Sequence, residues 1–141
     1  MNRITKILAV FALVLCGFPT SNLNAKDKNI GAATGDEAAT NLKMLQGKWQ
    51  AVDDKSDFLV FENNHRKEKG GGETQWDDDV FVLTDKPMRD GKAVAGHEAE
   101  KGHFIYCAKD DMCWAIAELT AKKLVLVYVG RGRVLEYRRV K

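Results

Sequence analysis

From residue 47 onward, short apolar segments alternate with clusters of turn-forming residues. Eight segments have the length and composition of strands, at about twelve residues per strand and turn, which is typical of an antiparallel barrel or sandwich. No helical pattern long enough to connect parallel strands lies between them, which disfavours a parallel sheet. The predicted strands are 49–52, 58–61, 66–69, 80–83, 103–107, 113–119, 124–129 and 134–140.

One short helix is predicted ahead of the strands. Ala38, Leu42 and Leu45 recur at i, i+4 and i+7, which is the spacing of one helix face. The sequence from Thr34 to Glu37 has the Thr-x-x-Glu form of a capping box, and Gly47 follows where a helix end is expected. We therefore predict an all-β domain over residues 34–141, with a short N-terminal helix.

The first 25 residues have the pattern of an export signal. Arg3 and Lys6 precede an uninterrupted apolar stretch over 7–15, and Ala25 offers a small residue before a charged start. About a dozen apolar residues are too few for a permanent membrane span. We predict a cleaved signal at 1–25 and a flexible leader at 26–33, hence a periplasmic or secreted protein that does not span a membrane.

Cys16 supports an alternative, in which the chain is a bacterial lipoprotein anchored through this cysteine. Lipoprotein processing normally requires a small residue immediately before the cysteine, and Leu15 stands there instead. Lipid anchoring is thus the weaker of the two hypotheses.

Charge argues against a nucleic-acid partner. The chain has 22 Lys and Arg against 20 Asp and Glu, and loss of Arg3 and Lys6 with the signal leaves the remainder near neutral. A nucleic-acid binder usually carries a basic excess. Hydrophobic residues make up 45% of the chain, which is enough for a packed core.

Without Cys16, two cysteines remain, Cys107 and Cys113. Both flank the polar connection 108–112, so they are expected to face each other across a hairpin, and an oxidising compartment favours a disulfide between them. Two independent buried thiols are the alternative. The C-x5-C spacing matches neither a zinc site nor a redox motif.

Little else in the sequence indicates catalysis or metal binding. His65, His97 and His103 lack the spacing of a metal site, and the acidic run 77–79 lacks the ligand pattern of a calcium loop. The glycine run 70–72 has no following Lys-Ser/Thr as in a phosphate-binding loop. We expect no enzyme activity, no metal and no cofactor.

Gly47-Lys48-Trp49, placed after a short helix at the start of the first strand, resembles the G-x-W opening of the lipocalin (calycin) family, here its small secreted bacterial members. The resemblance implies an eight-stranded up-and-down barrel in which the Trp seals one end. It also implies that an Arg near the last strand packs over this Trp, and Arg131 and Arg133 are the candidates.

The resemblance further implies a small apolar or amphipathic ligand inside the barrel. The residues expected to line that site are Phe58, Val60, Trp76, Phe81, Phe104, Trp114 and Tyr128. The alternative is an envelope accessory or inhibitor that binds a protein through loops such as 62–72 and 84–92, with the barrel as scaffold. An open apolar cavity favours the first hypothesis, and a packed interior favours the second.

Overall fold

A computed structural model describes residues 35–141. The predicted signal peptide, the leader, Cys16 and Thr34 lie outside the described residues. Within 35–141, no helix is long and apolar enough to cross a bilayer.

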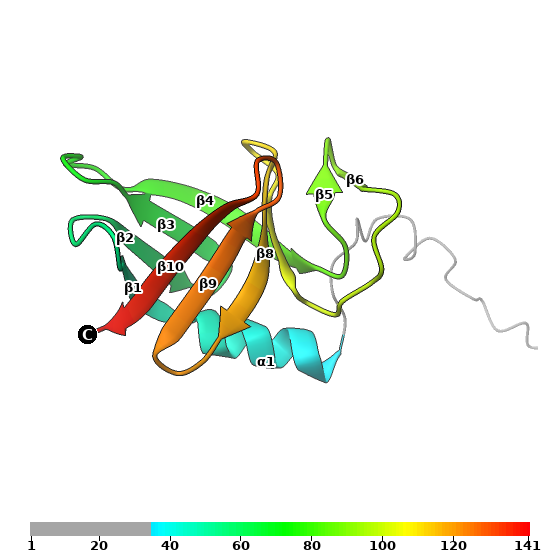
Figure 1. The fold of residues 1–141 in the computed structure, drawn as a ribbon, viewed down its shortest axis with the longest axis horizontal. Coiled ribbons are helices and arrows are strands. Elements are labelled where there is room, and N and C mark those ends of the chain that lie inside the picture. Colours follow the sequence, from blue (N-terminus) through cyan, green and yellow to red (C-terminus); the bar gives the residue numbers. More distant parts are fainter. Residues whose placement is uncertain (1–34) are drawn as a thin grey trace, which may run out of the picture.

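Eight antiparallel strands form a closed barrel, as predicted (Figure 1). Neighbouring strands follow chain order throughout, and the last strand pairs with the first, with Trp49 opposite Arg139. This up-and-down arrangement is consistent with a calycin-like fold. The barrel strands are β1 (Gly47–Ala51), β2 (Phe58–Glu62), β3 (His65–Lys69), β4 (Asp77–Thr84), β7 (Phe104–Cys107), β8 (Met112–Leu119), β9 (Lys123–Tyr128) and β10 (Arg133–Val140).

The two remaining strands, β5 (Met88–Arg89) and β6 (Lys92–Ala93), form a small hairpin beside the barrel (Figure 1). This hairpin belongs to the segment 85–103, which covers the outer face of β7 and β8. Met88 is buried there in a second apolar cluster with Phe104, Tyr106 and Cys113. The two loops of the alternative hypothesis contain regular structure: 84–92 includes β5 and the buried Met88, and 62–72 contains all of β3.

The helix α1 (Asp36–Leu45) lies across one end of the barrel (Figure 1). Leu45 is fully buried in the main core, so the helix plugs this end, which we call the closed end. The capping-box prediction is wrong in its details. The N-cap position is Gly35, one residue after the predicted Thr34, and within residues 35–141 no side chain caps the helix.

Trp49 and Arg139 complete the closed end. The Arg139 guanidinium lies 4.1 Å from the centre of the fully buried Trp49 ring. The implied Arg–Trp contact is thus present, but the arginine is Arg139, and Arg131 and Arg133 lie at the opposite end. Gly47 has φ +115, and a Cβ at this position would lie 2.8 Å from Arg139 Nη1, so the G-x-W glycine makes room for the arginine.

The predicted disulfide is absent, since Cys107 and Cys113 are both free and buried. The turn between β7 and β8 comprises residues 108–111 and is one residue shorter than predicted. Cys107 is therefore opposite Met112, and Cys113 is opposite Tyr106. This one-residue shift places the thiols on opposite faces of the sheet, Cys107 in the interior and Cys113 in the outer cluster. The alternative of two independent buried thiols agrees with the structure.

Candidate functional site

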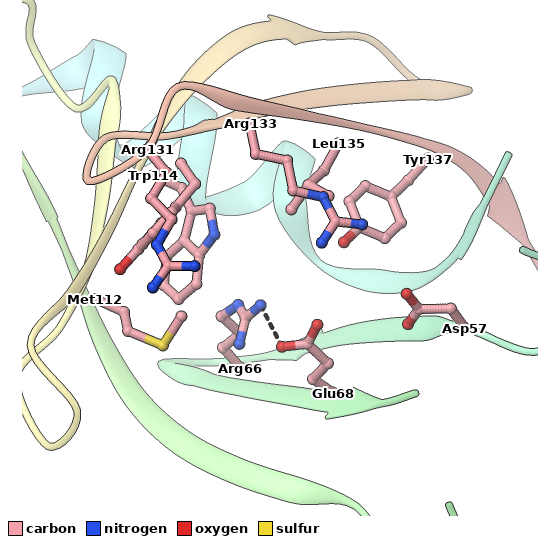
Figure 2. A pocket seen from close by; sticks show the side chains of 10 residues that line it. Asp57, Arg66, Glu68, Met112, Trp114, Arg131, Arg133, Leu135 and Tyr137 are labelled. Carbon is pink, nitrogen blue, oxygen red and sulfur yellow. Dashed lines mark hydrogen bonds and ion pairs between the residues drawn. The ribbon is translucent and has the colours of Figure 1, made fainter. Parts of the chain in front are cut away.

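The barrel is filled at its closed end and hollow at the other, which we call the open end. Trp49, Leu59, Phe61 and Leu126 are essentially inaccessible to solvent and fill the closed half. The open half contains a cavity of about 370 Å³, within the usual range for small-molecule sites (Figure 2). Its lining consists of Asp57, Arg66, Glu68, Met112, Trp114, Tyr128, Arg131, Arg133, Leu135 and Tyr137.

Strand alternation places most of these side chains. Arg66 and Glu68 project inward from β3, and Trp114 projects inward from β8, because residues two apart on a strand share a face. In Figure 2, Leu135 and Tyr137 come from β10 and face Arg66 and Glu68 across the cavity. The lining thus combines apolar side chains from β8 and β10 with the charged wall formed by Arg66 and Glu68 of β3.

Arg66 is the most unusual residue of the lining. It is only 4% exposed, and its guanidinium lies 4.1 Å from the centre of the Trp114 ring. Its Nη2 donates a 2.7 Å hydrogen bond to Glu68 Oε2, which Figure 2 marks with a dashed line. Its Nε is buried without a hydrogen-bond partner in residues 35–141. Buried polar groups are normally paired, so this donor is available to a further acceptor.

Asp57 lies at the edge of the same cavity, at the end of the turn that joins β1 to β2. The backbone carbonyl of Asp57 accepts a 3.0 Å hydrogen bond from the Ala51 amide, which holds this residue over the barrel. Its Oδ1 is buried and has no partner in the described part of the chain. Burial, and then the charges of Glu68 and Asp54, raise the pKa of the Asp57 carboxyl.

Burial and the same acidic neighbourhood also affect Tyr137, which lines the same cavity. Tyr137 is 2% exposed, and burial followed by the charges of Glu68 and Asp57 raises its pKa. The phenol of Tyr137 therefore stays neutral and presents a polar group to the cavity.

Arg131 and Arg133 form the rim, on and beside the turn between β9 and β10. Both are exposed, and neither side chain makes a hydrogen bond or ion pair with any residue in 35–141. They add two positive charges at the cavity mouth.

The structure brings together only two of the predicted ligand-binding residues. Trp114 and Tyr128 line the cavity, with ring centroids 5.9 Å apart. Phe81 is interior but lies in the packed core, in edge contact with Phe61 at 5.3 Å.

The other four predicted ligand-binding residues do not line the cavity. Phe58 and Val60 occupy the outer face of β2, where the Lys48 ammonium lies 4.4 Å from the Phe58 ring centre. Phe104 belongs to the outer cluster, and Trp76 is 41% exposed in the loop before β4. Where a strand carries apolar residues on both faces, the sequence does not show which face points into the barrel.

Sequence reasoning missed the charged wall. In the segment 65–69 every residue is polar, so alternation gives no sign that Arg66 and Glu68 point inward. A strand that is polar on both faces is also typical of a frayed edge strand, so the sequence of this segment did not indicate a charged interior.

The histidines do not form a site. His65 Nδ1 lies 2.8 Å from Asp78 Oδ1 on the outer surface, and His97 and His103 are in the segment 85–103. Within residues 35–141, no group of three His, Cys, Asp or Glu side chains is placed to hold a metal ion.

Comparisons with protein-family models, curated proteins and solved structures find no match to this chain.

Proposed function

We propose that this protein is an exported, lipocalin-like binding protein that holds a small amphipathic molecule in the open half of its barrel. The observation that supports this most directly is the cavity of about 370 Å³, which adjoins a tightly packed closed half. A barrel used only as a scaffold would have no need of a hollow half lined by both apolar and charged side chains.

The lining supports binding rather than covalent catalysis. Trp114, Met112 and Leu135 offer apolar surface, and the charged groups beside them would orient a polar end. Among the ten lining residues there is no serine, cysteine, histidine or lysine, and Asp57, Glu68 and Tyr137 are the side chains that could exchange a proton. The proposed role is binding, without a catalytic step.

Export remains part of the proposal and rests on the sequence alone. The basic residues, apolar stretch and small residue of 1–25 are its support, and a periplasmic or secreted carrier is the role that fits them. The proposed likeness to lipocalins is supported by the G-x-W segment together with the barrel topology.

The experiment is a titration of the purified protein with N-phenylnaphthylamine, a neutral apolar dye that fluoresces when it leaves water. We expect saturable, one-to-one binding. Leu135→Trp fills the cavity and should weaken binding at least about tenfold, since a single blocked site loses its apolar contacts. Val134→Trp is the matched control, because Val134 neighbours Leu135 on β10 and is 62% exposed on the outer face.

Native mass spectrometry of the protein from its exported compartment adds a second measurement. A retained mass that Leu135→Trp removes and Val134→Trp keeps supports the proposal. Dye binding that is absent in the wild type, or equal in the wild type and Leu135→Trp, contradicts it.

A further inference from the structure

We propose that the ligand carries a carboxylate head group and that this group binds the guanidinium of Arg66 inside the cavity, with the apolar part of the ligand against Trp114. This inference rests on the proposed function and specifies its ligand class.

Arg66 has unused hydrogen-bonding capacity. A guanidinium has five N–H donors, yet within residues 35–141 the Arg66 side chain makes one hydrogen bond, from Nη2 to Glu68. Its Nε is buried and unpaired among the described residues, and the side chain is only 5% exposed. Buried donors are normally paired, so these unused donors can take an acceptor from a ligand.

Glu68 occupies Nη2 of the guanidinium plane, and Trp114 covers one face, which fixes the orientation of that plane. Nε and Nη1 are left without a hydrogen-bond partner among the described residues. A carboxylate accepts stronger hydrogen bonds from charged donors of this kind than a neutral hydroxyl does, so it fits them better.

The charges of the lining favour an anion. Among the ten lining residues, Arg66, Arg131 and Arg133 exceed Asp57 and Glu68 by one positive charge. Asp57 is also more readily protonated than an ordinary aspartate, because burial and then the neighbouring acidic groups raise the pKa of its carboxyl. The two exposed arginines at the rim therefore attract an anion toward the cavity mouth.

Part of the lining is apolar. Met112, Trp114 and Leu135 present no charge, so a small inorganic anion would leave this surface unused. An amphiphile with a single anionic end satisfies both parts of the lining, and the volume of about 370 Å³ sets a limit near that of a short-chain or single-ring carboxylate.

The experiment measures displacement of bound N-phenylnaphthylamine by decanoate and by decanol, which share a chain and differ in charge. Both are used below their aggregation limits. For the wild type we expect decanoate to bind about tenfold or more tightly than decanol, since hydrogen bonds to a buried charge discriminate by at least that factor. This preference should fall below about threefold in Arg66→Met/Glu68→Gln, which removes both partners of the ion pair.

Two further variants show which arginines produce the preference for decanoate over decanol. Arg138→Met removes an arginine from the same barrel on its outer face, where Arg138 bonds Gln50, and should keep the full preference. Arg131→Gln/Arg133→Gln should weaken decanoate binding only about threefold. If Arg66→Met/Glu68→Gln does not fold, as judged by circular dichroism, Arg66→Lys serves instead. Lysine keeps the positive charge but lacks the planar set of guanidinium donors, so this variant should have a smaller preference for decanoate.

The outcomes separate the inference from the proposed function. Equal affinity for decanoate and decanol in the wild type overturns the carboxylate inference and leaves a binding barrel. A preference that depends on the rim pair and not on Arg66 also overturns it. Failure of the dye and both chains to bind the wild type overturns the proposed function itself.

Discussion

The two ends of the barrel carry the same contact with opposite consequences. At the closed end Arg139 stacks on Trp49, and at the open end Arg66 stacks on Trp114, with the guanidinium carbon 4.1 Å from the ring centre in both cases. Cation–π contact alone therefore does not distinguish the two ends.

The hydrogen bonds of the two arginines differ. Arg139 donates from Nε to the Ala121 carbonyl at 2.7 Å, and from its two terminal nitrogens to the carbonyls of Gln46 and Met44. Arg66 makes one hydrogen bond and has a buried Nε without a partner in residues 35–141. An arginine whose side-chain nitrogens all donate to backbone carbonyls stabilises the fold, whereas an arginine with unpaired donors in a cavity is available to a ligand.

The largest expected effect is at the closed end. Trp49→Ala should lower the free energy of unfolding by about 3–5 kcal/mol, because it leaves a large void under the helix and removes the surface on which Arg139 stacks. Chemical denaturation measures this change. Trp76→Ala, at an exposed tryptophan outside the core, is the control and should cost less than about 0.5 kcal/mol. A Trp49→Ala variant of wild-type stability would contradict this account of the closed end.

The arginines give the sharpest test of the comparison. Arg139→Met should cost about 2–3 kcal/mol, because three backbone carbonyls lose charged donors. Arg66→Met/Glu68→Gln should cost less than about 1 kcal/mol or stabilise the protein, since a buried ion pair can often be replaced without loss. Urea unfolding of both variants measures the two losses of unfolding free energy. Equal losses would contradict the distinction between a structural Arg139 and a ligand-binding Arg66.

Alkaline pH tests how dry the barrel interior is around Cys107. Burial raises the pKa of this thiol from 9.0 to about 12. In the unfolded chain the thiol ionises near its ordinary value, so the folded state binds the proton more tightly. Its contribution to stability is therefore complete below pH 9 and is lost as the pH rises toward 12.

At about pH 10.5 this loss amounts to about 2 kcal/mol for Cys107 alone. The measurement is the free energy of unfolding from about pH 8 to about pH 10.5 for the wild type and Cys107→Ser. The serine variant should lack this part of the pH dependence, while Tyr137, whose pKa is also raised, acts in both proteins. Identical pH profiles would mean that water reaches the thiol.

The smallest expected effect concerns the reductant. Because Cys107 and Cys113 lie on opposite faces, the thermal midpoint of the folded domain should differ by less than about 1 °C with and without dithiothreitol. Thiol titration of this domain should find both cysteines unreactive when folded and reactive in denaturant. A lower midpoint in reductant would restore the disulfide prediction.

Much of the fold was predictable because turn chemistry and apolar segments are local signals. The eight strands and the short helix followed from spacing, and the resemblance of Gly47-Lys48-Trp49 to the G-x-W opening implied that Trp49 seals one end. The Arg–Trp contact was predicted in kind, but the partner was misassigned to Arg131 and Arg133, since sequence does not show at which end of β10 the contact forms.

The site was less predictable, because it depends on register. The turn 108–111 has four residues, with Asp111 at φ 51, and this turn length decides which face Cys107 and Cys113 occupy. On β2, the choice between Phe58 and Leu59 as interior residues likewise depends on pairing that no local signal sets. Arg66 was missed because a charged interior contradicts the usual assignment of polar residues to the surface.

The contacts of Arg139 with the closed end also have a consequence for folding and assembly. The Arg139 guanidinium donates hydrogen bonds to backbone carbonyls 93 and 95 residues away in the sequence, and β1 pairs with β10 at the same place. Closure must therefore await the most distant pairing in the domain, which is slow by topology. Until then β1 and β10 present two unpaired edges, and each edge can pair with the complementary strand of another molecule. Loss of the Arg139 hydrogen bonds should therefore increase strand exchange between molecules and aggregation during refolding, without altering the cavity of the folded protein.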